Sequence, residues 1–136
     1  MNNLLTAIYG KTSGSALSAD VGGRIFLDRA PDNTEFPYVV FFIVSGVPDD
    51  VFTKDGESVL IQFSLFSASS GATEITNMYK DLKALFDDCS LTITSNTLQW
   101  FKRENLTTMI EDITTVNGAQ QIKHWAVDYN VTIQES

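Results

Sequence analysis

Alternating apolar and polar residues predict two long, half-buried β-strands. In residues 58–67 every second side chain is apolar, and residues 123–133 repeat this alternation near the C-terminus. Successive side chains of a strand point to opposite faces, so the pattern buries one face. Residues 38–45 are apolar almost throughout, which favours burial on both faces or cover from a partner. The Asp55-Gly56 pair predicts a hairpin between residues 38–45 and 58–67.

Apolar residues at steps of three and four predict helices. The clearest helix spans residues 73–88, and Ser69 or Ser70 is placed to cap it. A short amphipathic helix is predicted around residues 4–9, and a second short turn of helix ends at Asp20. The apolar stripe of the longest helix consists of Ile75, Met78, Tyr79, Leu82, Leu85 and Phe86.

Glycines and prolines divide the N-terminal third of the chain. Gly22 and Gly23 permit backbone angles that are closed to other residues. Residues 24–27 are predicted to form an edge strand, and residues 28–36 a surface loop. The sequence Val21-Gly22-Gly23-Arg24 lacks the lysine and the spacing of a phosphate-binding loop, so it indicates a simple turn.

The C-terminal half contains further strand patterns. Residues 91–94 and 98–104 are predicted to be strands joined at Ser95-Asn96, where asparagine tolerates a left-handed turn. Residues 106–118 have no firm period, so their state stays open, and Gly118 marks their end.

These patterns predict a single α+β domain over residues 1–136. Its fold class is a mainly antiparallel sheet of four to six strands with two or three helices packed on one face. Because the strands are not separated throughout by crossover helices, a parallel nucleotide-binding fold is disfavoured. The chain of 136 residues, 43% of them apolar, is long enough to bury a real core.

The charge balance argues against nucleic-acid recognition. Seventeen acidic and nine basic residues give a formal net charge of -8, which opposes approach to phosphates unless the basic residues cluster. They do not cluster, since Lys102-Arg103 lies beside Glu104. A wall along which DNA slides and ordinary solubility both fit this balance. The longest apolar run falls far short of the roughly 20 residues that span a bilayer, and the N-terminus lacks a secretory pattern, so the protein is expected to stay where it is made.

The supply of nucleophiles and metal ligands is small. Cys89 is the single cysteine and His124 the single histidine, which excludes an internal disulfide and a multi-histidine metal site. His124 is predicted on the polar face of its strand with Asp128, and Cys89 as a small buried hydrophobe. We therefore predict no catalytic residue, no cofactor and no metal site.

Two further patterns favour structural roles. The acid pairs Asp49-Asp50, Asp87-Asp88 and Glu111-Asp112 lack the ligand spacing of a calcium loop and are predicted to be solvated. In Trp100-Phe101-Lys102-Arg103 the side chains alternate faces, so a core residue flanked by solvated cations is favoured over a stacking platform for nucleic acid.

The loop at residues 46–57 places apolar residues among charged ones. A loop that meets only solvent has no need of them, so they either fold back onto the domain or anchor a neighbouring subunit. The candidate residues for a subunit or tube interface are Val47, Asp49, Asp50, Val51 and Phe52.

The order of these features resembles the tail-completion proteins of long-tailed bacteriophages and prophages, also described as tail terminator or tail-to-head joining proteins. The resemblance covers nearly the whole chain, and its motifs are structural. The residues that carry it are Leu4, Ile8, Tyr9, Val21-Gly22-Gly23-Arg24-Ile25-Phe26, Ala30-Pro31, Phe36-Pro37-Tyr38-Val39-Val40-Phe41, Ile61-Gln62-Phe63-Ser64, Met78-Tyr79, Leu82 and Asp128-Tyr129-Asn130-Val131.

The resemblance implies a structural protein rather than an enzyme. Such proteins assemble as a ring, typically of six, at the head-proximal end of the tail tube, where they end tube polymerisation and face the head connector. The implied partners are further copies of the chain, the tail tube protein and the head-side connector or stopper, with DNA passing through the ring without specific binding. The implied location is the host cytoplasm during assembly and then the virion tail.

Two readings from other classes stay open on the sequence alone. An exposed sheet edge would let the chain act as a small cytosolic peptide- or protein-binding module. An enzyme would require Cys89 or the acid pairs to converge in a pocket with perturbed titrating groups.

Overall fold

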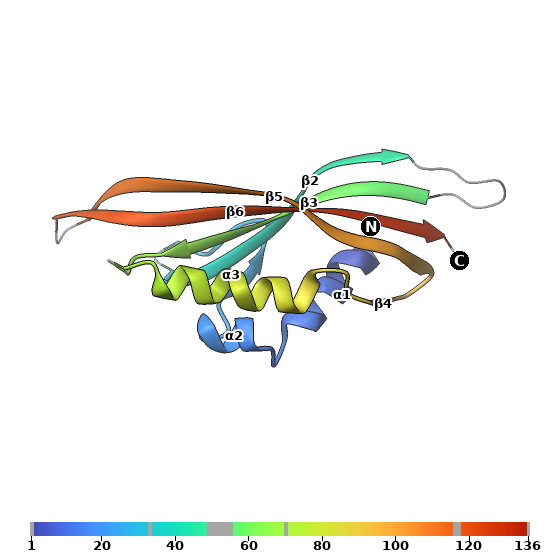
Figure 1. The fold of residues 1–136 in the computed structure, drawn as a ribbon, viewed down its shortest axis with the longest axis horizontal. Coiled ribbons are helices and arrows are strands. Elements are labelled where there is room, and N and C mark those ends of the chain that lie inside the picture. Colours follow the sequence, from blue (N-terminus) through green and yellow to red (C-terminus); the bar gives the residue numbers. More distant parts are fainter. Residues whose placement is uncertain (1, 33, 49–55, 70, 116–117, 136) are drawn as a thin grey trace.

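The computed structural model describes residues 2–32, 34–48, 56–69, 71–115 and 118–135. This part of the chain contains three helices and six strands (Figure 1). The helices are α1 (Asn2–Thr12), α2 (Ala16–Asp20) and α3 (Thr73–Phe86). The strands are β1 (Ile25–Leu27), β2 (Tyr38–Pro48), β3 (Gly56–Ser67), β4 (Thr92–Ile93), β5 (Asn96–Thr115) and β6 (Gly118–Glu135).

The six strands form one sheet in the order β1-β2-β3-β6-β5-β4. Every pair is antiparallel except β1 with β2, which is parallel. Figure 1 shows the helices together on one side of this sheet. The predicted α+β class, with a mainly antiparallel sheet and helices on one face, is confirmed.

The core lies between the helices and this side of the sheet. Phe63 of β3 is at its centre, with its ring 5.7 Å from Phe41, 4.8 Å from Phe86 and 5.6 Å from Tyr129. All four side chains are fully buried. Each large apolar side chain buried in this way stabilises the fold by about 1.5–3 kcal/mol. Further members of the same cluster are Leu4, Ile8, Leu17, Ile75, Met78, Leu82, Phe101, Val127 and Val131.

Helix α3 follows its predicted stripe, because Ile75, Met78, Leu82 and Phe86 are all buried. Its predicted cap is wrong for Ser69. Ala72 is the N-cap residue and makes no side-chain capping bond. The backbone N–H of Ser69 instead bonds to the hydroxyl of Ser67 at 3.2 Å. Ser70 lies outside the described residues.

Strand β5 is much longer than predicted. It runs without interruption through residues 98–104 and through most of the segment whose state was open. Its register with β6 extends from Asn96↔Glu135 to Thr115↔Gly118, with two shifts on the way. The pairing with β6 therefore determines the conformation of residues 106–115, whose own side-chain pattern does not.

Two hairpins extend beyond the helix-covered part of the sheet. The pairing of β3 with β6 stops at Ser67↔Lys123, whereas β5 and β6 continue to pair with each other up to Thr115↔Gly118. Figure 1 shows this β5–β6 arm at one end of the molecule and the β2–β3 hairpin at the opposite end.

The predicted edge strand at residues 24–27 is confirmed as β1. It pairs with β2 from Ile25↔Val39 to Leu27↔Phe41. Gly22 and Gly23 precede it with φ of 60° and 78°, which is the left-handed region that glycine adopts without strain. No pattern in the sequence indicates that β1 and β2 pair in parallel.

Candidate functional site

The side of the sheet opposite the helices carries no helix in the described part of the chain (Figure 1), and we call it the open face. Because strand residues alternate, β6 presents Val127 and Tyr129 to the core and the residues between them to the open face. The predicted polar face of the C-terminal strand, with His124 and Asp128, is thereby confirmed. The open face of β3 consists of Ser58, Leu60, Gln62, Ser64 and Phe66.

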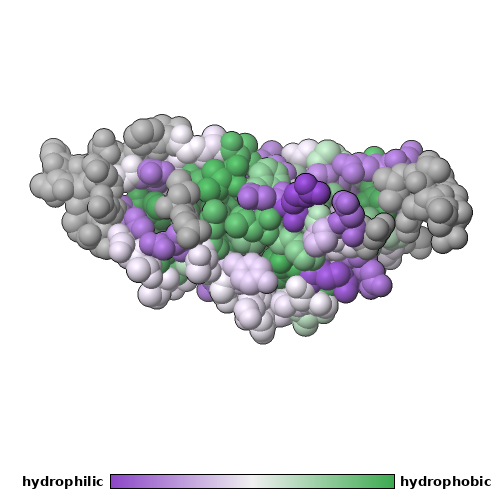
Figure 2. All heavy atoms as spheres, turned by 180° about the vertical axis from the view of Figure 1, so that it is seen from behind, coloured by the Kyte–Doolittle hydropathy of each residue, from purple (hydrophilic) through white to green (hydrophobic). Residues whose placement is uncertain are grey.

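A groove of ≈ 850 Å³ lies on the open face beside the loop at residues 28–36. Its floor comes from β2, β3 and β6, and its rim from the loop. Figure 2 shows the molecule from behind relative to Figure 1, with apolar side chains gathered in the middle between hydrophilic ones. Exposed apolar areas with a polar border are typical of interaction surfaces. The floor of the groove consists of Tyr38, Val40, Phe42, Gln62, Ser64, Phe66 and His124.

Aromatic rings form a continuous row across this groove. Phe36 lies 5.2 Å from Tyr38, Tyr38 lies 4.7 Å from Phe66, and Phe66 stacks on His124 at 4.3 Å between ring centroids. The row therefore joins the loop to β2, β3 and β6. It gives the open face a preformed apolar surface of the kind that binds another protein.

Two buried polar atoms of β6 lack hydrogen-bond partners among the described residues. They are Nε2 of His124 and Oδ1 of Asp128. The other ring nitrogen of His124, Nδ1, lies 3.1 Å from Oε1 of Glu111. Burial, and then the charge of Glu104, raise the pKa of Asp128. Buried polar groups are usually hydrogen-bonded, so these two atoms are exceptions on the open face.

The structure does not bring His124 and Cys89 into one site. His124 lies on the open face, where the β6 register places it opposite Phe66 and Met109. Cys89 lines a different cavity, whose other described lining residues lie between Ser90 and Gln99 and include no histidine. Burial raises the pKa of the Cys89 thiol to about 11, so it is protonated and unreactive near neutral pH.

The acid pairs also remain apart. Asp87 takes part in a polar cluster, Glu111 pairs with His124, and Asp49-Asp50 lies outside the described residues. Within the described ranges, no group of three or more His, Cys, Asp or Glu residues is placed to hold a metal ion. None of the helices in these ranges is long and apolar enough to cross a membrane.

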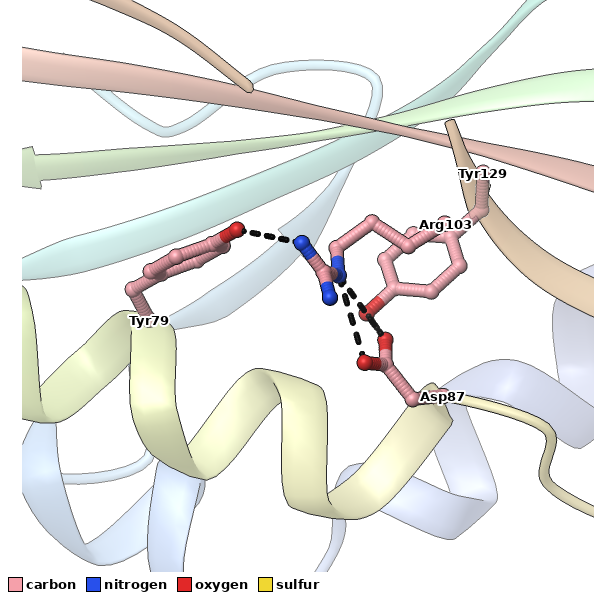
Figure 3. Close-up of polar contacts among 4 residues, drawn as sticks. All are labelled: Tyr79, Asp87, Arg103 and Tyr129. Atoms are coloured by element: carbon pink, nitrogen blue, oxygen red, sulfur yellow. Dashed lines mark hydrogen bonds and ion pairs between the residues drawn. The ribbon is translucent and has the colours of Figure 1, made fainter. Parts of the chain in front are cut away.

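A polar cluster joins the end of α3 to the sheet (Figure 3). The carboxylate of Asp87 accepts hydrogen bonds from Nε of Arg103 at 3.2 Å and from the hydroxyl of Tyr129 at 2.6 Å. Arg103 also donates to the hydroxyl of Tyr79 at 2.8 Å. Burial, and then the bond to Asp87, raise the pKa of Tyr129, which keeps its hydroxyl protonated as a donor. Asp87 and Arg103, which were predicted as solvated charges, are partly exposed, and they also connect the end of α3 to β5 and β6.

A second polar contact joins α2 to α3. Oδ2 of Asp20 is buried without a hydrogen-bond partner in the described part of the chain. Burial, followed by a hydrogen bond with the neighbouring carboxyl of Asp81 and by its negative charge, together raise the pKa of Asp20 from 3.8 to about 6.

We expect Asp20→Asn to stabilise the protein near pH 7.5. The pKa of Asp20 is higher in the folded than in the unfolded state, so its contribution to stability is complete below pH 3.8 and is lost as the pH rises through about 6. Asparagine carries no charge, so the variant escapes this loss. Since Asp20 is partly solvated, the gain is roughly 0.5–1 kcal/mol. Melting temperatures at pH 4.5 and pH 7.5 measure it.

Asp112→Asn is the matched control, because it removes one charge from an exposed carboxyl on β5. The control should change stability equally little at both pH values. An Asp20→Asn variant whose gain is as large at pH 4.5 as at pH 7.5 would show that the carboxyl of Asp20 is not responsible.

The predicted interface loop falls mostly outside the described residues. Of its candidates, Val47 belongs to β2, where it pairs with Ser58. Asp49, Asp50, Val51 and Phe52 follow immediately and are not described. These five residues remain a prediction.

Comparisons with known proteins complete this description. The family model described as "Tail completion protein gp17" matches residues 6–134. A chain from a solved structure described as "Virion of native gene transfer agent (GTA) particle" is similar at a TM-score of 0.73 and 13% identity, over 96% of this chain and 94% of that chain. A second solved structure matches at a TM-score of 0.53, with the same identity and coverage. At these identities the two structures show a shared fold. No curated protein sequence matches.

The family match covers nearly the entire chain and agrees with the resemblance that the sequence motifs indicated. It also decides between the classes of function, because tail completion is a structural role in a virion and not a catalytic one. The protein is therefore a structural phage-tail protein and not an enzyme, and the chain belongs to the tail completion protein gp17 family.

Proposed function

We propose that this protein caps the tail tube at its head-proximal end, ends tube polymerisation and forms the ring that joins tail to head. The observation that carries the proposal is the family match over residues 6–134. The likeness to a chain from the structure described as a gene transfer agent virion supports it, since that chain is part of a virion.

The arrangement of the sheet supports a ring, for which the family resemblance implies six copies. A ring requires two different contact surfaces on each copy, so that the head of one meets the tail of the next. The sheet offers one edge at β1 and β2 and another at β5 and β4. The open face is a third surface, available to the tail tube protein or to the head-side connector.

The charge of the chain supports passage of DNA through such a ring. A net charge of -8 repels a phosphate backbone, so an acidic channel would let DNA slide without specific contacts. Assembly would take place in the host cytoplasm, and the finished ring would reside in the virion tail.

The decisive experiment adds purified tail tubes to the purified protein. Electron microscopy and native mass measurement should find a closed ring at one end of each tube and no further growth of the capped tubes. Tubes that keep growing in excess protein, with no density at either end, would contradict the proposal. A monomer that binds short extended peptides instead would favour the peptide-binding module.

The loop after β2 is proposed to contact the tube or the neighbouring subunit through Val47, Asp49, Asp50, Val51 and Phe52. We expect Phe52→Asp to reduce capping at least about tenfold, because it replaces an apolar anchor by a charge. The number of capped tubes at fixed protein concentration measures the effect. Thr53→Asp is the control, since it adds the same charge to the same loop without removing an apolar side chain. Equal capping by wild type and Phe52→Asp would exclude this role for the loop.

A further inference from the structure

The sheet has a long free edge on each side. On one side β4 pairs only with Asn96 and Thr97 of β5, and Asp88 N–H bonds to Phe101 O. From Lys102 onward β5 has no further strand partner there among the described residues. On the other side β1 ends opposite Phe41, so the rest of β2, up to Pro48, is also without a neighbour in the described part.

Each free edge contains an uncharged stretch that is open to pairing. Natural proteins blunt exposed edges with charges, prolines or bulges. On β5, however, residues 106–110 are Leu-Thr-Thr-Met-Ile without a charge, and they follow the last register shift of the strand. On β2, residues 42–47 are Phe-Ile-Val-Ser-Gly-Val, also without a charge; one register shift lies between Ile43 and Ser45, and Pro48 ends the strand. Both segments have the composition of paired strands.

Exposed apolar side chains gather at these same edges. Among the described residues, all exposed large apolar side chains except Tyr9 lie on β1, β2 or β5. Val44 on β2 is 49% exposed and Ile110 on β5 is 69% exposed. Ile110 also borders a cavity of ≈ 440 Å³ that it shares with Trp125, beside the free edge. The β5 edge thus has both unpaired backbone and an apolar notch.

The hydrogen-bond pattern shows which backbone groups of β5 face outward. Phe41 O accepts from Asp28 N–H on the β1 side at 2.9 Å, so the next residue of β2 faces β3. Opposite residues of antiparallel strands direct their N–H and C=O groups either toward each other or away from each other. The orientation of Phe42 therefore determines that of each residue paired with it across the sheet, and the backbone groups of Asn105 face β6. The backbone of Thr107 and Met109 then also faces β6, and Leu106, Thr108 and Ile110 direct their N–H groups to the free side. The residues paired across the sheet in this way are Phe42, Gln62, Asp128 and Asn105.

We propose that the free edge of β5 in one copy pairs with the free edge of β2 in the next copy, so that the sheets of neighbouring subunits become continuous. The proposal rests on the proposed ring and names the surface that closes it. The occupant of each edge is a second copy of this chain, because each copy carries both edges on opposite sides of one sheet.

Strand direction and charge fix how the copies pair. Within the sheet, β2, β3, β6 and β5 alternate in direction, so β5 and β2 of successive copies in the same orientation are antiparallel. This arrangement brings the Lys102 end of β5 to the Pro48 end of β2, where the exposed Glu57 lies. Parallel pairing would bring Glu111 and Asp112 there instead, which is a repulsive contact.

Thr108→Pro tests the edge directly. Proline removes the N–H that faces the neighbouring copy, and it leaves the hydrogen bonds between β5 and β6 intact because those come from the residues on either side. We expect subunit association to weaken at least about tenfold. Native mass measurement on tail tubes or at high protein concentration reports the loss of rings. Thr108→Ala keeps the N–H and should assemble as wild type.

Circular dichroism and the melting temperature show whether Thr108→Pro still folds. If this variant misfolds, cross-linking decides instead. In a Cys89→Ala background, the pair Val44→Cys and Thr108→Cys on one chain should give a ladder of oligomers under mild oxidation. Each single-cysteine variant should give little product beyond monomer. Efficient dimers from Thr108→Cys alone would mean that two β5 edges pair with each other and would overturn the inference.

The outcomes separate this inference from the proposed function. Capped tubes and closed rings without any ladder, and with Thr108→Pro equal to Thr108→Ala, would refute the edge pairing and leave the capping role intact. Absence of both capping and rings would refute both.

Discussion

Phe63→Ala is expected to destabilise the folded protein by about 3–5 kcal/mol, because it empties the centre of the core. The ring of Phe63 is fully buried among Phe41, Phe86 and Tyr129, and these come from both layers of the fold. Domains of this size have a free energy of unfolding of about 5–15 kcal/mol, so the loss is a large fraction of the total. Urea unfolding followed by tryptophan fluorescence measures it.

Phe42→Ala provides the matched control. Phe42 is the same residue type on the next strand, but its side chain is partly exposed on the open face. It should cost less than half as much free energy as Phe63→Ala. Equal losses for the two variants would contradict the placement of the core on the helix side of the sheet.

Asp87→Ala is expected to cost about 1–3 kcal/mol, because it leaves the buried hydroxyl of Tyr129 without an acceptor. It also frees Arg103, whose side chain is 37% exposed and whose own ion pair contributes little. Removing the orphaned hydroxyl as well should recover part of the loss. The double variant Asp87→Ala with Tyr129→Phe is therefore expected to be more stable than Asp87→Ala alone.

Denaturant unfolding of wild type, Asp87→Ala, Tyr129→Phe and the double variant forms a double-mutant cycle. The cycle isolates the coupling energy between Asp87 and the hydroxyl of Tyr129. Arg103→Ala is the control for the exposed part of the cluster and should cost less than about 1 kcal/mol. If the losses in unfolding free energy of Asp87→Ala and Tyr129→Phe simply add in the double variant, Asp87 does not stabilise the hydroxyl of Tyr129.

The elements that the sequence predicted are those with a local physical signal. The alternation in β3 and β6, the apolar stripe of α3 and the glycines before β1 each reflect constraints within a few residues. The fold class follows from their order, and the helix-free face of β6 follows from its polar residues. These predictions required no knowledge of which strands pair.

The features that sequence patterns missed depend on contacts between distant residues. Residues 106–115 are a strand because β6 pairs with them, although their side chains follow no period. Asp87 resembled a solvated helix residue, but the helix ends before it and its side chain turns to Arg103 and Tyr129. The aromatic row of the groove combines single residues of β2, β3 and β6, and only the sheet order brings them together.

The strand order has a consequence for how the chain folds. The hairpins β2–β3 and β5–β6 each join neighbouring segments, and such hairpins form within about 1–10 μs. The central contact of β3 with β6 instead pairs Phe63 with Val127, which α3 and all of β5 separate along the chain. The entropy of closing this long loop is lost before the contacts between the two hairpins form. Docking of the hairpins is therefore expected to limit the folding rate. During synthesis, β3 therefore waits with an unpaired edge until β6 has left the ribosome, and this interval is when the nascent chain is most exposed to aggregation.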